Sequence, residues 1–395
     1  MVIYSLTFNP QRVFMNIKGL TKLPILFICF SFLLGFAADS TSNEKEISAK
    51  LKITDGYQVE FLSFLESARL FAFGPDRELL IGSKSPNIYR LRPPYAKPEL
   101  LASIQGAYAV HSLTLRNNYL YAADSCAVYR AEYPSNKPLD FKLFVKLPCE
   151  NGGHYTRTII SGPQQQLFVS LGISGNCSNE FLDNRYTFEK RRGGIFKIDT
   201  SGQHPELKPY ASGLRNPIGM TFYKDDLYAT NAGSDNLGYE LPPEVIAKTA
   251  PGSFHGMPWY QYFNGQFNNG QCTSSPSPVS IDKATTPFAL LDARSTPMGI
   301  DFPSSGSFKN MAIVAVHGSW GQKPGGGRET RRPPRIIGID INEPTKIIDI
   351  VSGLQRSDGS RLARPVGVLQ GPDGHIYFSS DGGELQGIFR LKAKH

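Results

Sequence analysis

The sequence predicts an all-β fold, a six-bladed β-propeller, from three observations. Charged residues make up only 19% of the 395 residues, and the chain has 38 Gly and 29 Pro. This composition is typical of many turns and short strands rather than of long helices. Apolar residues alternate with polar ones in short runs along the chain. These runs group into a unit that recurs six times, at intervals of roughly 40 to 80 residues.

Each repeat has an apolar strand, a turn, a second strand of the type "LYA", and a third strand that ends in an aromatic or basic residue. A blade of this size leaves both faces uncovered, and packing the blades side by side buries them. Pairing of "YQVEFLSF" with the late strand "GIFRL" would close the ring and cover its last edge. The segments 235–280 and 321–334 are expected to be loops. The innermost strands begin near Arg69, His111, Arg157, Asn216, Pro297 and Pro365.

Residues 1–37 are predicted to be a signal peptide. Lys18 and Lys22 precede an apolar run of 14 residues (23–36), which ends in a small-x-small cleavage pattern at Ala37. The run is shorter than the roughly 20 residues of a membrane span, although an uncleaved anchor is the alternative. We therefore expect a secreted (extracellular) protein, or a periplasmic one in a bacterium, without stable membrane insertion. A linker over 38–55 and one propeller domain over 56–395 would follow.

Export to an oxidising compartment favours disulfides among the four cysteines that remain after cleavage, and these allow three connectivities. The preferred hypothesis pairs Cys126 with Cys149 and Cys177 with Cys272. Asn176 begins an Asn-Cys-Ser glycosylation sequon, which a eukaryotic host could use. The net charge of +8 falls to about +5 without the signal peptide, which is compatible with an anionic ligand pocket.

The residues just before the innermost strands carry the functional prediction. In a propeller these strands line the central channel, so the residues that precede them converge on one channel mouth. Burying several arginines without partners is costly, so the pattern favours an anionic ligand. Pairing with local acids and carbonyl groups is the alternative. The converging positions are Arg69, His111, His154 with Arg157, Arg215 with Asn216, Ser295 with Thr296, and Arg364.

Several ordered motifs match one enzyme family. They are "NGGHYTRTI", "GLRNPIGM", "LGYELPPEVI" followed by "HGMPWY", "VAVHGSW", and "RPVGVLQGPDGHIYFSSDGG". Over roughly residues 60–393 the chain resembles the soluble pyrroloquinoline quinone (PQQ) dependent sugar dehydrogenases. This is the glucose/sorbosone dehydrogenase family, which includes fungal-type pyranose dehydrogenases.

The resemblance implies an oxidoreductase that holds PQQ and Ca²⁺ at the channel mouth and oxidises an aldose, a pyranose or a related alcohol by hydride transfer. His154 matches the general base of the family. Arg215 and Asn216 match the residues that hold the quinone and carboxylate oxygens. An external electron acceptor is implied, namely a cytochrome, a quinone or a partner redox protein. Further candidates are Arg69, Arg157, Lys323 and Arg364 for the cofactor, and Gly233, Ser234 and Asp235 for the metal.

The chain departs from the family pattern at two places. Its metal loop has Ala232 and Tyr239 where relatives are rich in acids. Before the fifth inner strand it offers Arg294 and Ser295, where many members carry His. These departures predict an altered calcium affinity or a changed substrate.

Two other classes of function remain open. One is a propeller without redox chemistry that binds a glycan or a protein, and the other is a calcium-dependent lactonase. The motif His317-Gly-Ser-Trp-Gly differs from a nucleophile elbow, and the Gly- and Pro-rich residues after it favour a strand-end turn. The basic run 323–335 is typical of a solvated loop, and the sequence has no nucleotide or zinc motif. We therefore expect no nucleic-acid partner.

Overall fold

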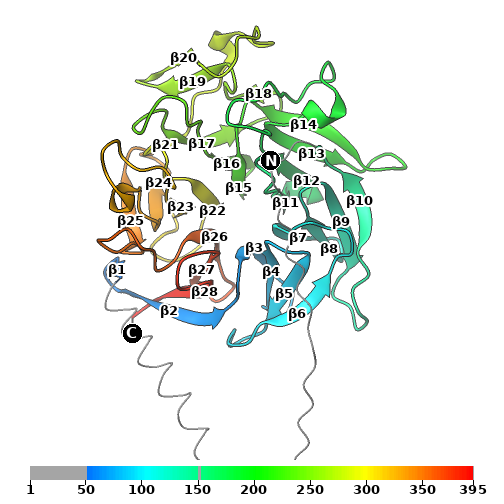
Figure 1. Ribbon diagram of the computed structural model, residues 1–395. Helices are drawn as coiled ribbons and strands as arrows, with labels where there is room; N and C mark the ends of the chain where they lie inside the picture. The colour runs from blue at the N-terminus through cyan, green and yellow to red at the C-terminus, as the bar shows by residue number, and fades with distance from the viewer. Residues whose placement is uncertain (1–50, 150–152, 395) are drawn as a thin grey trace, which may run out of the picture. The chain divides into compact units, whose positions relative to one another are not determined.

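The computed structural model describes residues 51–149 and 153–394, and these residues form a six-bladed β-propeller (Figure 1). The predicted fold class is confirmed. The predicted signal peptide and most of the predicted linker lie outside the described residues. Within the described part, the helices are short 3₁₀ turns, and none is long and apolar enough to cross a bilayer. They are η1 (Pro163–Gln165), η2 (Phe188–Lys190), η3 (Ile281–Lys283) and η4 (Arg328–Thr330).

The four main strands of each blade pair antiparallel, and the first of them is the innermost (Figure 1). Blade 1 contains β3 (Ala68–Phe73), β4 (Leu79–Ser83), β5 (Asn87–Leu91) and β6 (Glu99–Ser103). Blade 2 contains β7 (Ser112–Arg116), β8 (Tyr119–Ala123), β9 (Ala127–Glu132) and β10 (Lys142–Lys146). Blade 3 contains β11 (Ile159–Ser161), β12 (Leu167–Leu171), β13 (Gly194–Asp199) and β14 (Glu206–Ser212).

The other three blades continue the ring. Blade 4 contains β15 (Pro217–Tyr223), β16 (Asp226–Asn231), β17 (Glu244–Thr249) and β21 (Ala289–Leu291). Blade 5 contains β22 (Pro297–Asp301), β23 (Met311–Val316), β24 (Arg335–Asp340) and β25 (Ile347–Ser352). Blade 6 contains β26 (Pro365–Gln370), β27 (Ile376–Ser380), β28 (Gly387–Ala393) and, as its outer strand, β2 (Tyr57–Phe64).

The ring closes as predicted, because β2 ("YQVEFLSF") pairs along its length with β28. The expected linker needs a correction at its end. Residues Lys52–Ile53, inside the range 38–55, form β1 and pair with the outer strand β25 of blade 5. The edge of β25 would otherwise present unpaired backbone groups, and β1 covers it.

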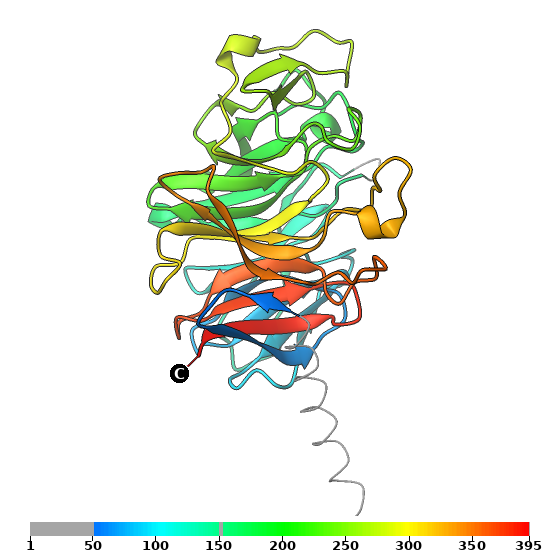
Figure 2. The ribbon, with the colours of Figure 1, turned by 90° about the vertical axis from the view of Figure 1, so that its left-hand side faces the viewer.

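Long connections lie outside the blades. Both predicted disulfides are present, Cys126–Cys149 and Cys177–Cys272. The expectation of a loop over 235–280 is wrong for 244–249, which is β17. The short strands β18 (Ser253–Phe254), β19 (Tyr260–Phe263) and β20 (Gln266–Asn269) also lie in that range, and β19 and β20 form a hairpin beyond the blades in both views (Figures 1 and 2). Proline and glycine residues flank β17 in "LPPEVIAKTAPG". Because these residues are typical of loops, the six-residue strand between them is hard to recognise from the sequence.

The inner strands approach one another closely because their third residue is glycine in three blades. A Cβ at Gly299 would lie 2.6 Å from Val366 O of the next inner strand, and one at Gly367 would lie 2.8 Å from the Phe71 ring. A Cβ at Gly219 would collide with Met298 O. The Pro-x-Gly starts of β15, β22 and β26 therefore let these backbones pack side by side. A cavity of about 220 Å³ lined by all six inner strands remains along the axis.

Candidate functional site

The starts of the six inner strands meet at one end of the ring, here called the channel mouth. Every pair of neighbouring blades is joined there by a hydrogen bond or an ion pair, so the converging residues form a closed ring. The bonds run from Leu70 N–H to His111 O (3.2 Å), Ser112 Oγ–H to Arg157 O (3.1 Å), Ile173 N–H to Arg215 O (2.9 Å), Arg294 Nε–H to Gly238 O (3.0 Å), Arg364 Nε–H to His317 O (3.3 Å), and Arg69 Nη1–H to Asp381 Oδ2 (2.6 Å).

His154 and Arg215 lie beside each other, on either side of Ile173. The backbone N–H of His154 donates to Ile173 O, and its ring Nδ1 lies 2.8 Å from the same oxygen. A carbonyl can only accept, so Nδ1 carries the proton and Nε2 keeps its lone pair. Burial, and then the charge of Arg215, lowers the pKa of His154 to about 4. The imidazole is therefore neutral at pH 7, and its Nε2 lone pair is free to accept a hydrogen bond or a proton.

Arg215 is buried and partly committed to the chain. Its Nε and Nη2 donate to the backbone and side-chain oxygens of Asn176, each at 2.9 Å, and Nη1 donates to Ala232 O. The neighbouring Asn216 is held by its backbone N–H, which donates to Asn231 Oδ1 at 2.9 Å. Its own buried Oδ1 has no hydrogen-bond partner among the described residues. Asn216 therefore offers an amide to a ligand.

Arg157 does not behave as a ligand-binding residue, which corrects its predicted role. It has no exposed surface, and its guanidinium donates to backbone carbonyl groups at Ser125 (3.1 Å), His154 (2.6 Å) and Pro148 (3.3 Å). Burial lowers the pKa of Arg157 to about 9. Arg157 thus anchors the segment that carries His154.

Asp381 organises the opposite side of the mouth. It pairs with Arg69 (2.6 Å) and Lys84 (3.0 Å), and His317 Nε2 lies 3.6 Å from its Oδ1. Although burial raises the pKa of Asp381, the charges around it bring the pKa well below its usual range. Burial lowers the pKa of His317 to about 3, so at pH 7 Arg69 and Lys84 are the cations that act on Asp381.

Two acceptors face each other in this cluster. His317 Nδ1 lies 3.1 Å from Pro365 O, which places the proton on Nδ1 and leaves a lone pair on Nε2. The Oδ1 atom that it faces is buried and has no hydrogen-bond partner in the described chain. Nearby, both ring nitrogens of buried His111 also lack partners within residues 51–149 and 153–394. Such unsatisfied buried atoms are rare in folded proteins and are expected to meet a ligand or water.

Exposed aromatic rings surround the mouth. The Arg364 guanidinium lies 4.2 Å from the centre of the Trp320 ring, and that side chain is 71% exposed. Arg331 and Arg361 flank the same ring at 5.8 Å and 5.9 Å. On the other side, the exposed Tyr155 ring lies 5.9 Å from His111. Planar faces next to cations suit a flat, anionic ligand.

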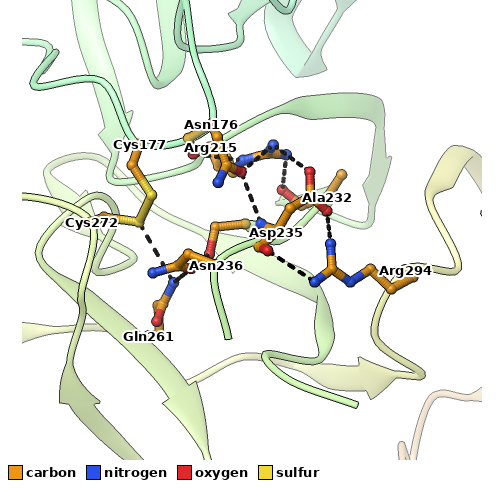
Figure 3. The surroundings of a disulfide bond; sticks show 10 residues. Asn176, Cys177, Arg215, Ala232, Asp235, Asn236, Gln261, Cys272 and Arg294 are labelled. Carbon is orange, nitrogen blue, oxygen red and sulfur yellow. Dashed lines mark hydrogen bonds and ion pairs between the residues drawn. A yellow bond between two sulfur atoms is a disulfide. The ribbon is translucent and has the colours of Figure 1, made fainter. Parts of the chain in front are cut away.

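The remaining predicted residues lie in loops. Lys323 is exposed on the loop 321–334, where its backbone N–H and O bond to Thr330 and Gly326 of the same loop. In the predicted metal loop, the N–H of Gly233 donates to Glu244, and the Ser234 hydroxyl donates to Asn236. The carboxylate of Asp235 pairs with Arg215 and Arg294 (Figure 3). The described residues contain no group of three or more His, Cys, Asp or Glu side chains arranged to hold a metal ion.

Sequence reasoning missed Lys84, His317 and Asp381. Each directly follows the second strand of its blade, β4, β23 or β27. Because the first two strands of a blade are antiparallel, the end of the second lies beside the start of the first, as in the pairing of Pro365 with Ser380. The position directly after each second strand could therefore have identified these three residues as lying at the channel mouth.

Comparisons with known proteins agree with the fold. No family model matches the chain. A curated relative, described only as an uncharacterized protein of Borreliella burgdorferi, is 24% identical over 375 residues, covering 88% of this chain and 92% of that protein.

Three solved structures share the propeller. The holo form of the pyranose dehydrogenase PQQ domain from Coprinopsis cinerea matches with a TM-score of 0.69 and 17% identity, over 87% of this chain and 97% of that one. A calcium structure of a Trichoderma reesei carbohydrate-active enzyme of family AA12 matches with a TM-score of 0.70 and 18% identity, over 87% of this chain and 97% of that one. The apo form of the soluble aldose sugar dehydrogenase from Escherichia coli matches with a TM-score of 0.61 and 14% identity, over 86% of this chain and 100% of that one. At these identities the likeness establishes the shared fold.

Proposed function

We propose that this protein is a secreted oxidoreductase that oxidises an aldose, a pyranose or a related alcohol with PQQ as its cofactor. The observation that carries the proposal is the neutral His154, whose Nε2 lone pair is fixed by Ile173 O next to Arg215 and Asn216. The fold shared with pyranose and aldose dehydrogenases supports the same reaction class. The electrons would then pass to an external acceptor, such as a cytochrome, a quinone or a partner redox protein.

The residues of the mouth fit a planar quinone that bears several carboxylates. Arg69 Nε–H and one N–H of the neutral His111 ring are buried donors without partners in the described chain, and Asn216 Oδ1 could accept from an N–H or O–H group of the ligand. Arg69, Arg215 and Arg364 would hold the carboxylates and quinone oxygens, since a guanidinium matches carboxylate geometry. Bound PQQ would supply a two-electron acceptor for the hydride that leaves the sugar carbon.

The protein's own contribution is proton transfer and orientation. His154 Nε2 would accept the proton of the sugar hydroxyl as the carbon–hydrogen bond breaks, and Ile173 O would stabilise the imidazolium through Nδ1–H. A hydroxyl group of the sugar would donate a hydrogen bond shared by His317 Nε2 and Asp381 Oδ1. This bond would orient the substrate. Trp320 and Tyr155 would cover the ring faces and exclude water.

Reconstitution tests this function. The purified chain is mixed with PQQ, and dye reduction is followed with a panel of aldoses and pyranoses. We expect turnover with PQQ and none without it. His154→Ala should lower kcat by about 10² to 10⁴-fold, the usual contribution of a general base, while PQQ binding stays nearly unchanged. Equal loss of PQQ binding would contradict the role of His154.

The same assay separates the alternatives. A binding propeller would take up a glycan or protein without reducing the dye at any sugar concentration. A lactonase would open lactones without added quinone. Either result, obtained with folded protein, would replace the dehydrogenase proposal.

A further inference from the structure

The guanidinium of Arg294 binds oxygens of the loop 231–240, in which the calcium ion was expected. It donates to the carboxylate and the backbone oxygen of Asp235 (Figure 3). It also donates to the backbone oxygen of Gly238. The Nε–H bond to Gly238 O measures 3.0 Å, and the Nη2–H bond to Asp235 O measures 3.1 Å. Carboxylate and carbonyl oxygens are the ligands that Ca²⁺ takes in proteins. In this chain they bind a side-chain cation instead.

The backbone around Arg294 adopts an uncommon conformation. Arg294 has φ 70° and Thr296 has φ 55°, both in the left-handed region that residues other than glycine rarely adopt. Here the turn between β21 and β22 brings the guanidinium of blade 5 onto the loop of blade 4.

Two other side chains at the loop are hydrogen-bonded within the chain as well. The Ser234 hydroxyl lies between Asn236 and Gln261, which belongs to the β19 hairpin. The buried carboxylate of Glu244 accepts the backbone N–H groups of Gly233 and Thr296. The Ser234 hydroxyl and the Glu244 carboxylate therefore already have partners within the chain.

The charges of the loop are balanced without a metal. Asp235 pairs with both Arg215 and Arg294, and Arg215 also bonds Asn176, next to the Cys177–Cys272 disulfide (Figure 3). A calcium ion at these oxygens would lie beside two guanidinium groups and would be repelled by both. Asp235 and Gly238, held in this way by arginines, therefore do not fit calcium.

We infer that Arg294 replaces calcium in this protein: its guanidinium supplies the fixed positive charge at the blade 4 loop, and the mouth binds its anionic ligand without a divalent metal. The part that concerns the ligand rests on the proposed function. The part that concerns the loop does not, because it predicts how the ligand-free protein responds to calcium.

The first test uses the whole purified protein without quinone or sugar. Its melting temperature is measured after EDTA treatment, then with millimolar CaCl₂ or MgCl₂, and calcium binding is measured by calorimetry. We expect melting temperatures within about 1 °C of one another and no calcium binding below millimolar concentration. A calcium-dependent rise in melting temperature, or micromolar calcium binding that Asp235→Asn abolishes, would overturn the inference.

The second test compares Arg294→Gln with Arg328→Gln, a control that removes another loop arginine, paired with Asp358 at 3.4 Å. Arg294→Gln should lower the melting temperature by roughly 2–4 °C relative to the control. It should also become responsive to CaCl₂ but not MgCl₂, because the Asp235 and Gly238 oxygens are freed for the larger ion. A variant that melts like the control, or that melts earlier without any calcium response, would show that Arg294 does not stand in for the metal.

A third measurement addresses the ligand. PQQ binding is followed by quenching of tryptophan fluorescence in EDTA and in CaCl₂. Equal affinity in both conditions is expected, and affinity found only with calcium would contradict the inference. If PQQ binds in neither condition, the proposed function fails, whereas the calcium results on the ligand-free protein stand by themselves.

Discussion

His154 owes its basic nitrogen to a backbone carbonyl. Ile173 O holds the proton on Nδ1, and Arg157 and Arg192 hold the carbonyl of His154 itself at 2.6 Å and 3.3 Å. The ring is thus positioned before any ligand arrives, which is how a general base gains most from its place in a site. Burial keeps the ring neutral by lowering its pKa to about 4.

This protonation state can be measured directly. In the ligand-free protein at pH 5.5, His154 should still be neutral, in the Nδ1–H form, since the solution pH lies above its pKa of about 4. Nitrogen-15 NMR of the histidines distinguishes the two neutral forms and the imidazolium, and the signal absent from His154→Gln identifies the residue. An imidazolium signature at pH 5.5 would contradict the assignment.

The arginines show what a sequence can and cannot predict at the scale of one residue. Arg69 and Arg157 both precede or begin an inner strand, and both were predicted to bind the cofactor. The hydrogen-bond partners of the two side chains differ. Arg69 pairs with Asp381, 312 residues away in sequence, whereas the guanidinium of Arg157 is enclosed by backbone carbonyl groups. Position along the strand is local information, and the partner is supplied by distant segments.

At the scale of elements, the Pro-x-Gly start of an inner strand performs two tasks. Proline begins the strand after the polar residue that points to the mouth, and glycine lets the next blade approach. The predicted strands were correct largely because this motif and the alternation recur in sequence. The strand β17 was hidden because glycine and proline on both sides resemble a loop, and only pairing with β16 and β21 defines it.

Gly299→Ala tests the close approach of the inner strands. The added Cβ would lie 2.6 Å from Val366 O and 2.9 Å from Val368 N, both backbone atoms of β26. Blades 5 and 6 must then separate, which should cost about 1–3 kcal/mol of unfolding free energy, as other overpacking changes do. Urea denaturation measures this cost.

The matched control is Gly321→Ala. A Cβ at Gly321 meets nothing within 4 Å, and its backbone angles need no glycine. The control should unfold at the same urea concentration as the unchanged protein, or slightly higher. Equal midpoints for the two variants would mean that the strands tolerate a wider spacing.

At the scale of the whole molecule, buried titratable groups set the response to pH. Burial lowers the pKa of four histidines: His154 and His255 to about 4, His317 to about 3, and His111 well below its usual value. The unfolded chain takes up these protons near pH 6.5, before the folded chain does, so stability is lost as pH falls from about 6.5 towards 4.

Two buried acids act in the opposite sense. Burial raises the pKa of Glu244 to about 7 and of Asp301 to about 6. The folded chain therefore binds these protons first, and their contribution to stability grows as pH falls. The four histidines outnumber the two acids, so the unfolded chain binds more protons than the folded chain in this range. Each proton of that difference changes the unfolding free energy by roughly 1.4 kcal/mol per pH unit.

The melting temperature should therefore fall steadily between pH 6.5 and pH 5. Differential scanning calorimetry of the ligand-free protein at constant ionic strength measures it. His255→Gln, a change away from the mouth residues, should reduce the slope. A melting temperature that rises on acidification across this window would contradict the balance of charges.

The fold was predictable at this scale because a ring of repeats has only one way to bury its blade faces and close its edge. The site was predictable only in part. The starts of the inner strands were found, but the residues that follow the second strands, Lys84, His317 and Asp381, were not. Nor could the sequence reveal that Arg294 crosses from blade 5 to Asp235 of blade 4.

The central claim is that six distant segments build one pocket for an anionic quinone beside His154. A crystal of the protein soaked with PQQ tests it most directly. The account predicts quinone density at the channel mouth, in contact with His154, Asn216 and the arginines of the ring, in crystals grown with EDTA. Density at another surface, or an empty mouth in crystals that hold PQQ elsewhere, would contradict it.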